Sequence, residues 1–260
     1  MHAEGTLEAE RSTFRLEHVS MRFGGLDALR DVSLSIAEKR ITGVIGPNGA
    51  GKTTLFNIAT GFLSPTAGRV VLGSTDVTGR RPDEFARSGV ARTFQNIRLF
   101  RHMNVLENVL AGSLAQRQLG WRQIVPSRRN KHDEKVSRRA TELIARVGMR
   151  GHEHVMVGRL PYGQQRRVEI ARALATEPSI LLLDEPSAGM NPQEAVELAG
   201  LIRSFRDDGT TVVLIEHNMR LVMDLSDNIA VLNFGAKIAE GTAAAVTQNP
   251  EVITAYLGSP

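Results

Sequence analysis

The stretch ITGVIGPNGAGKTT, residues 41–54, determines the kind of fold to expect. Residues 41–45 form an apolar run of strand length, and residues 46–53 fit the pattern GxxxxGK[ST]. In that pattern a glycine-rich loop surrounds phosphate oxygens with its backbone N–H groups. The apolar residues that follow favour a helix whose N-terminus faces the phosphates. The stretch therefore predicts a strand, loop and helix that bind the phosphates of a nucleotide.

Individual residues of this loop have separate expected roles. The Lys52 ammonium should meet the β- and γ-phosphate oxygens, and the Thr53 hydroxyl should be a ligand of Mg²⁺. The residues expected to contact the nucleotide here are Gly46, Pro47, Asn48, Gly49, Ala50, Gly51, Lys52, Thr53 and Thr54.

Polar residues follow three further strand-like runs. In ILLLDE, residues 180–185, Asp184 is placed to hold Mg²⁺ through water and Glu185 to act as a general base on the attacking water. Gln95 follows the run 90–94 and can reach metal or water, and His217 follows the run 212–216 and can donate to the γ-phosphate. Because ligands of open α/β sheets bind at the carboxyl ends of strands, these four side chains are predicted to share one site.

Phe23 lies upstream of the phosphate loop, in the stretch Met21–Gly25. An aromatic ring there could stack on an adenine base. The competing interpretation is a phenylalanine buried in the core.

Composition limits the classes of protein to which this chain can belong. The chain has 260 residues, of which 42% are hydrophobic, so it can bury a large core. It has no cysteine, which excludes disulfides and thiolate metal sites and fits a reducing cytoplasm. Its apolar runs fall far short of the roughly 20 residues of a membrane-spanning helix. Residues 1–12 are interpreted as a polar leader without a secretory signal.

The net charge of +4 is unevenly distributed. Residues 117–139 hold eight Lys or Arg against Asp133 and Glu134. A solvated helical face or loop is one interpretation, and contact with anionic lipid headgroups or an acidic partner is the other. Nucleic acid is disfavoured because Trp121 is the only aromatic residue in the segment.

Hydrophobic patterning changes along the chain. Period-two alternation at residues 14–19 and 32–36, with residues 69–72, predicts an antiparallel layer. The unbroken apolar runs at residues 41–45, 180–184 and 211–215 are typical of strands covered on both faces in a parallel sheet. Residues 97–155 show helical periodicity instead, which indicates a helical insert in an α/β core.

These motifs, in this order, resemble those of the ATP-binding subunits of ABC transporters, and the resemblance covers nearly the whole chain from Phe14 onward. It implies an α/β P-loop NTPase fold: a RecA-like parallel core, an antiparallel β subdomain and an inserted α-helical subdomain. The implied roles are Walker A at residues 46–53, the Q-loop at Gln95, Walker B at Asp184 and Glu185, the switch histidine at His217 and an adenine-stacking aromatic at Phe23.

The resemblance also implies domain boundaries. Residues 13–258 would form a single domain, with residues 13–95 and 156–240 as the core and β layer. Residues 96–155 would form the helical subdomain, and residues 241–260 a C-terminal extension.

The family's signature motif falls at LPYGQ, residues 160–164. In ABC dimers this motif caps the nucleotide held by the other subunit, so the resemblance implies contacts in trans from Leu160, Pro161, Tyr162, Gly163 and Gln164. Tyr162 could instead simply pack against its neighbours. The helix expected over residues 165–175 would point its positive end at the γ-phosphate.

This signature lacks the usual serine hydroxyl, since Pro161 takes its place, and the sequence YGQQRR is similar to the importer subgroup for branched-chain amino acids. Asn191 and Asn218 stand where that family commonly has aspartate. The tail over residues 233–258 also resembles the extension of this subgroup.

The resemblance implies an ATPase that requires ATP and Mg²⁺ and is peripheral on the cytoplasmic face of the inner membrane. Its implied partners are membrane-spanning permease subunits, a second ATPase subunit in a head-to-tail dimer, and indirectly a substrate-binding protein, but no nucleic acid. Residues 96–110 would either form much of the groove that grips a permease helix or belong to the subdomain core.

Two alternatives stay open at this stage. One is an ABC ATPase for another cargo, such as urea or amide uptake or lipopolysaccharide export. The other is a soluble non-transport ABC-type ATPase. That class needs long coiled-coil arms between Walker A and the signature, where this chain has only 108 positions and no sustained heptads.

Overall fold

Two β-sheets carry the fold of the computed structural model, which describes residues 12–115 and 131–257. The larger sheet has six strands in the order β10-β9-β3-β8-β7-β6. Strands β9, β3, β8, β7 and β6 are mutually parallel, and β10 is antiparallel at the edge. Their bounds are β3 (Ile41–Ile45), β6 (Val90–Arg92), β7 (Ile180–Asp184), β8 (Thr211–Ile215), β9 (Asn228–Asn233) and β10 (Ala236–Gly241).

The three unbroken apolar runs become the centre of this sheet. Every residue of β3, β7 and β8 is buried, because helices cover one face and a second sheet with α1 (Lys52–Ala59) covers the other. Burial on both faces removes any need for alternating polar residues. The prediction of parallel strands at residues 41–45, 180–184 and 211–215 is confirmed.

The smaller sheet is antiparallel, with strand order β2-β1-β4-β5. Its strands are β1 (Ser12–Phe23), β2 (Leu26–Ala37), β4 (Ala67–Leu72) and β5 (Thr75–Asp76). Phe14, Leu16 and Val19 of β1 point into the core together with Val32 and Leu34 of β2. The predicted antiparallel layer is therefore confirmed, and its two long strands extend beyond the predicted ranges.

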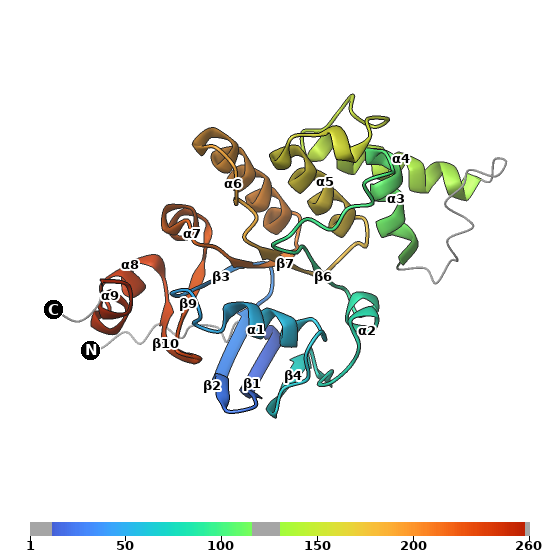
Figure 1. The fold of residues 1–260 in the computed structure, drawn as a ribbon. Helices are drawn as coiled ribbons and strands as arrows, with labels where there is room; N and C mark the ends of the chain where they lie inside the picture. The colour runs from blue at the N-terminus through green and yellow to red at the C-terminus, as the bar shows by residue number, and fades with distance from the viewer. Residues whose placement is uncertain (1–11, 116–130, 258–260) are drawn as a thin grey trace, which may run out of the picture.

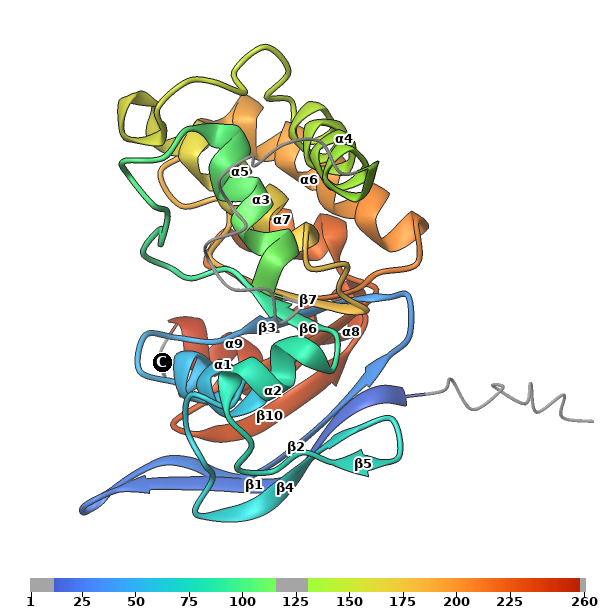
Figure 2. The ribbon, with the colours of Figure 1, turned by 90° about the vertical axis from the view of Figure 1, so that its right-hand side faces the viewer.

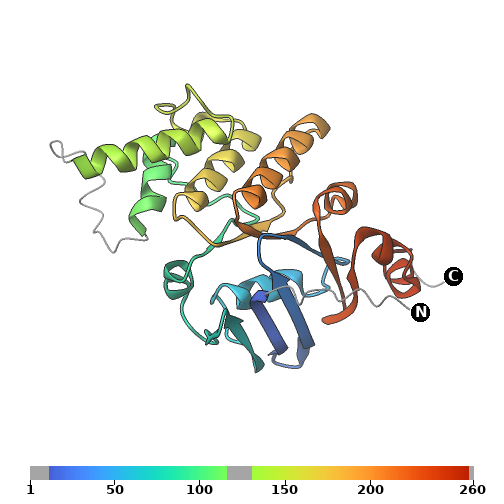
Figure 3. The same ribbon diagram turned by 180° about the vertical axis from the view of Figure 1, so that it is seen from behind.

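Helices complete the layers (Figure 1). Besides α1, they are α2 (Pro82–Arg87), α3 (Val105–Ala115), α4 (Lys131–Arg146), α5 (Tyr162–Leu174), α6 (Pro192–Asp207), α7 (Met219–Leu225), α8 (Ala243–Thr247) and α9 (Pro250–Leu257), with a 3-10 turn at Val157–Arg159. Figure 2 shows α3 to α7 on one side of the six-stranded sheet and α1 between the two sheets. The helical insert predicted over residues 97–155 contains α3 and α4, and α4 packs on α3 and α5, as seen from behind in Figure 3.

One expectation changes at this level. The helix expected from residue 165 begins at Tyr162, because Pro161 adopts an extended conformation (φ −55°, ψ 154°) that suits the position before a first helical residue. The basic segment 117–139 lies mostly outside the described residues. Within the described parts of the chain, no helix is long and apolar enough to cross a membrane.

Candidate nucleotide-binding and hydrolysis site

The predicted polar residues gather at the carboxyl edge of the parallel sheet. Strand β3 leads into the phosphate loop, Asp184 ends β7, and His217 follows β8. The register pairs Ile215 with both Val44 and Asp184, so these three strand ends lie level with one another. Gln95 follows β6, the neighbour of β7. The topology therefore accounts for the convergence of residues that are far apart in the sequence.

The phosphate loop is held in shape by its own backbone and by the β9–β10 turn. The Ala50 N–H donates to the Pro47 carbonyl oxygen at 3.2 Å, and the Gly235 N–H donates to the Ala50 carbonyl oxygen at 3.1 Å. Helix α1 begins at Lys52, directly after Gly51, which has a φ of 102°. The N-terminal N–H groups of this helix are thus available for an anion, as the sequence predicts.

Lys52 is buried beneath the loop. Its Nζ donates to the carbonyl oxygens of Gly46 at 2.7 Å and Pro47 at 2.9 Å. Burial lowers the pKa of this ammonium, and the charges of Glu185 and Asp184 oppose that effect. The two carbonyl oxygens hold the ammonium beneath the loop, near the carboxylates of Glu185 and Asp184, where the phosphates would lie.

A pocket of about 480 Å³ opens between this loop and the strand ends. Its lining includes residues 48–54, Gln95, Glu185, His217 and Phe23. The Phe23 residue is 45% exposed, so the alternative of a buried phenylalanine is wrong. Phe234, at the β9–β10 turn, adds a second exposed aromatic ring to the pocket, and the sequence analysis missed it.

Two of the predicted polar residues, Gln95 and His217, both contact a third, Glu185. Its Oε1 lies 2.8 Å from His217 Nε2, and its Oε2 accepts a hydrogen bond from Gln95 Nε2 at 3.0 Å. Glu185 also has a φ of 47°, which is rare for a residue with a side chain. A carboxylate held from two sides at the pocket wall is suited to accept a proton from water.

Asp184 is almost fully buried, and its carboxylate has a partner that the sequence analysis did not identify. Its Oδ2 accepts a hydrogen bond from Arg92 Nη2 at 2.7 Å, with 6% and 3% of the two side chains exposed. Among the described residues, no hydrogen bond engages Asp184 Oδ1. One oxygen of this carboxylate therefore stays available to a metal's water.

A buried ion pair on α5 holds the backbone around Gln95. Arg166 and Glu169, 0% and 1% exposed, lie 2.7 Å apart. Arg166 donates to the carbonyl oxygens of Phe94 and Gln95, and Glu169 Oε1 accepts from the N–H of Arg98 at 3.2 Å. Because α5 carries the signature at its start, this clamp connects the signature helix to the residue that contacts Glu185.

Glu216 is a further missed residue, which acts on the site through the backbone. It is 3% exposed, its Oε1 accepts from the Ser187 N–H at 2.7 Å, and its Oε2 accepts from the His217 N–H at 3.1 Å. The loops after β7 and β8 are therefore tied together by one buried carboxylate.

The signature residues lie apart from this pocket. Of the described residues that line it, none comes from Leu160 to Gln164. Leu160 is buried in the helical core, Pro161 precedes α5, and the Tyr162 hydroxyl donates to the Gln95 carbonyl oxygen at 3.4 Å. Tyr162 thus contacts the Q-loop backbone of its own chain, and the expected contacts of residues 160–164 in trans stay a prediction.

Asn191 and Asn218 both act as helix N-caps. The Asn191 side chain accepts from the Glu194 N–H at 3.0 Å, and the Asn218 side chain accepts from the Leu221 N–H at 3.2 Å. Asparagine and aspartate cap helices about equally well. The asparagines therefore keep the local role that an aspartate would have.

An apolar groove of about 480 Å³ runs between α2, α3, α5 and the segment after β6. Its walls include Phe62, Phe94, Phe100 and Ala111. Of the segment 96–110, Phe100 is 51% exposed in this groove, whereas Val105 is fully buried in the core. The core interpretation is thus confirmed for Val105, and the permease-groove interpretation stays a prediction for Phe100.

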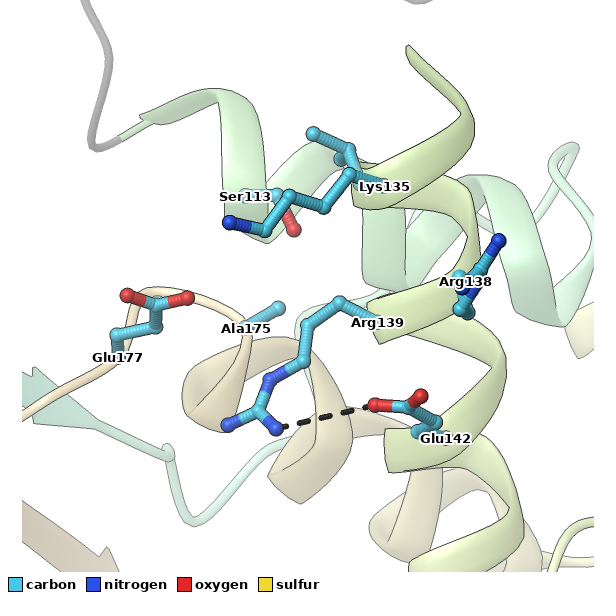
Figure 4. A pocket seen from close by; sticks show the side chains of 8 residues that line it. Ser113, Lys135, Arg138, Arg139, Glu142, Ala175 and Glu177 are labelled. Carbon is cyan, nitrogen blue, oxygen red and sulfur yellow. Dashed lines mark ion pairs between the residues drawn. The ribbon is translucent and has the colours of Figure 1, made fainter. Parts of the chain in front are cut away.

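A further pocket, of about 390 Å³, lies beside α4 and away from the strand ends (Figure 4). Lys135, Arg138 and Arg139 line it together with Glu142 and Glu177. Arg139 lies 3.9 Å from Glu142, and both side chains are more than half exposed. Opposite charges share this solvated face, so the lipid-contact interpretation of the basic segment stays a prediction.

The two loop glycines Gly51 and Gly49 allow a sharp test of the loop. Both have positive φ, 102° and 81°, but a Cβ at Gly51 would lie 2.6 Å from the Ala28 carbonyl oxygen, whereas a Cβ at Gly49 would meet nothing within 4 Å. Gly51→Ala should therefore shift the loop and weaken ATP binding by about tenfold or more, a loss that needs only 1.4 kcal/mol.

The measurement is calorimetric titration of each variant with ATP. Gly49→Ala is the matched control, since it adds backbone strain without a clash and should lose clearly less affinity. Equal losses for the two variants would contradict a steric requirement at Gly51.

Known protein families and structures resemble this chain over most of its length. The family described as "ABC transporter" matches residues 29–188, and the family described as "Branched-chain amino acid ATP-binding cassette transporter" matches residues 236–260. The high-affinity branched-chain amino acid transport ATP-binding protein LivG of Escherichia coli (strain K12) is 48% identical over 242 residues, which cover 92% of this chain and 94% of LivG. The corresponding BraF of Pseudomonas aeruginosa is 44% identical over 253 residues, 95% of this chain and 98% of BraF.

The solved structures that resemble this chain are also ATP-binding cassettes of ABC transporters. The ADP conformation of an ATP-binding cassette of an ABC transporter superposes with a TM-score of 0.84 at 32% identity, over 95% of this chain and 99% of that one. A dimeric bacterial ABC transporter cassette superposes with a TM-score of 0.76 at 26% identity, over 88% and 98% of the two chains.

Proposed function

Because this chain belongs to the ABC transporter family of ATP-binding proteins, we propose that it is the ATP-hydrolysing subunit of an importer for branched-chain amino acids. The observation that carries the ATPase activity is the meeting of Gln95, Glu185 and His217 in the pocket that contains the Walker A loop. The cargo rests on the similarity to LivG and BraF, whose names describe branched-chain amino acid transport.

In the proposed reaction, a water molecule attacks the γ-phosphorus of ATP while Glu185 accepts one of its protons. The bond between the γ-phosphorus and the bridging oxygen breaks, and ADP and phosphate result. Gln95 and His217 fix the Glu185 carboxylate on both sides, and the charge of Lys52 offsets the negative charge of the phosphates. The Phe23 ring, exposed at the pocket edge, provides a surface for the adenine base.

We assign Mg²⁺ to the oxygens of Thr53, Gln95 and Asp184. The donor set fits, because Thr53 offers a hydroxyl, Gln95 keeps its amide oxygen while its nitrogen bonds Glu185, and Asp184 keeps Oδ1. A bound Mg²⁺ would neutralise charge on the β- and γ-phosphate oxygens. The contact with Asp184 would run through water.

We propose that two subunits form a head-to-tail dimer, in which Leu160 to Gln164 of each chain complete the pocket of the other. Their absence from the pocket lining of their own chain supports this arrangement. The positive end of α5 would then face the partner's γ-phosphate. The partner subunit can be identical or homologous.

Permease subunits are the proposed membrane partners, and their docking element would be an apolar helix in the groove between α2, α3 and α5. The exposed ring of Phe100 and the small residues Ala111 and Gly112 contribute an apolar surface to that groove, on which an apolar helix could pack. The chain would then sit peripherally on the cytoplasmic face of the inner membrane. Residues 13–95 and 156–240 would act as the core, residues 96–155 as the docking subdomain and residues 241–260 as the extension.

The proposal is tested by purifying the chain with its membrane partners and reconstituting the complex with a binding protein in liposomes. We expect ATP-dependent uptake of leucine, and a complex with Phe100→Asp that assembles poorly because a charge enters the apolar groove. Ile253→Asp, at an exposed position on α9, is the control for surface charge. Uptake of urea but not leucine would contradict the cargo, and a complex without ATP hydrolysis would contradict the activity.

A further inference from the structure

Arg92, the last residue of β6, is enclosed behind the proposed magnesium site. Its side chain is 6% exposed. Nη2 donates to Asp184 Oδ2 at 2.7 Å, and Nη1 donates to Asn57 Oδ1 at 2.7 Å and to Thr60 Oγ1 at 3.2 Å. Both terminal nitrogens are therefore committed, and the guanidinium has a fixed orientation toward Asp184.

Three aromatic rings surround the same guanidinium. Its Cζ lies 5.6 Å from the ring centroid of Phe56, 5.9 Å from that of Phe62 and 5.1 Å from that of Phe94. Phe62 and Phe94 also pack edge to face, with centroids 5.5 Å apart. Such rings favour a cation over their faces and exclude water, so the positive charge remains close to Asp184 and poorly screened.

Burial lowers the pKa of Arg92, and the hydrogen bond to Asp184 opposes this effect. A guanidinium nevertheless keeps its charge at any pH at which the protein is folded. Arg92 is therefore a permanent positive charge bonded to one oxygen of the carboxylate that the proposed Mg²⁺ needs. The guanidinium and the proposed Mg²⁺ would both be attracted to the carboxylate of Asp184.

We propose that Arg92 is a positioning residue that fixes Asp184 and weakens the binding of Mg²⁺ with nucleotide. The inference rests on the proposed function, since it concerns the metal of that same site. The weakening follows from charge: a cation paired with a metal's carboxylate cancels part of the negative potential that holds the metal. Arg92 can position Asp184 because hydrogen bonds hold both Nη1 and Nη2 of its guanidinium.

Arg92 also lines the apolar groove between α2, α3 and α5. Arg92, Phe62 and Phe94 all line the apolar groove proposed for the permease helix. An occupant of that groove would press on the rings that hold the guanidinium. The occupied groove and the metal site would thus share one side chain.

The test measures metal binding directly. Mn²⁺, as a paramagnetic probe for the Mg²⁺ site, is titrated into the wild type, Arg92→Met and Arg92→Lys in the presence of a non-hydrolysable ATP analogue, and bound metal is followed by electron paramagnetic resonance. We expect Arg92→Met to bind Mn²⁺ more tightly by about tenfold, the scale on which ligand charge tunes divalent sites. Arg92→Lys, which keeps the charge, should stay near the wild type.

Arg146→Met is the matched control, because Arg146 also lies over an aromatic ring, 4.8 Å from the Phe205 centroid, and pairs with Asp208 far from the pocket. It should leave the Mn²⁺ affinity unchanged. If Arg92→Met does not fold, Arg92→Gln takes its place: its amide can still donate to Asp184 but carries no charge, so it should tighten Mn²⁺ binding in the same direction.

The outcomes separate the two proposals. Unchanged Mn²⁺ affinity in Arg92→Met, or in Arg92→Gln where it replaces that variant, would overturn the role of Arg92. Mn²⁺ binding that is absent in the wild type, or that has unchanged affinity in Asp184→Asn, would instead overturn the proposed metal site. A thermal scan adds a second readout: nucleotide with metal should raise the Tm of Arg92→Met by more than it raises that of the wild type, since only the variant has an uncompensated Asp184.

Discussion

Replacing Glu185 with glutamine should slow ATP hydrolysis by about 10²–10⁴-fold while leaving ATP binding intact, the range expected when a general base is removed. The amide keeps the shape of the side chain and can still contact His217 and Gln95, but it cannot accept a proton from water. The measurement combines single-turnover hydrolysis with calorimetric titration of ATP. Because ATP would persist in the pocket, size-exclusion chromatography should also show a dimer that survives in the presence of ATP.

The control for this change is Glu142→Gln on α4, where the carboxylate is 59% exposed and its ion pair with Arg139 is 3.9 Å long. Exposed pairs of this kind contribute little to stability. Hydrolysis should stay at the wild-type rate in that variant. A Glu185→Gln protein with unchanged turnover would remove this carboxylate from the role of base.

Breaking the buried Arg166–Glu169 pair should have the largest effect on stability. Arg166→Met leaves Glu169 charged and without its partner in the interior, which should lower the free energy of unfolding by about 3–5 kcal/mol. Replacing both residues with methionine should recover most of that loss, since no uncompensated charge remains. Chemical denaturation of the wild type, Arg166→Met and the double variant measures this.

Catalysis should not recover together with stability. The clamp contacts the backbone of Phe94, Gln95 and Arg98, and two methionine side chains cannot replace those hydrogen bonds. The double variant is therefore expected to be stable and still slow in ATP hydrolysis, with a lowered kcat rather than a raised KM. Full turnover in a stable double variant would show that the pair serves the core alone.

The sequence was most informative where a single local rule decides the structure. Unbroken apolar runs predicted the buried strands β3, β7 and β8, and the glycine pattern predicted the phosphate loop at the start of α1. The order of strands then accounts for the meeting of Gln95, Glu185 and His217, since each follows a strand and parallel strands end at one edge.

The buried residues that were missed share one physical cause. Arg92, Arg166, Glu169 and Glu216 are charged, and charged side chains are usually interpreted as solvent-exposed. Their burial depends on partners distant in sequence, such as Asp184 for Arg92, 92 positions away. One local signal existed: Arg166 and Glu169 stand three positions apart on a helix, a spacing at which opposite charges can pair. Sequence spacing could suggest that pair but not its contact with the Q-loop backbone.

Helix α5 has two roles, one in each nucleotide site of the proposed dimer. Its first turn presents the signature to the partner's nucleotide in the proposed dimer, and Arg166 and Glu169 hold the loop beside the chain's own Glu185. A substitution in the signature would therefore affect both nucleotide sites. It would change a contact in the partner's pocket, and it would disturb the loop beside Glu185 in the substituted chain. Arg166 Nη2 also donates to the Tyr162 hydroxyl at 3.0 Å, so the signature and the clamp on the Q-loop are joined by a direct hydrogen bond within one helix.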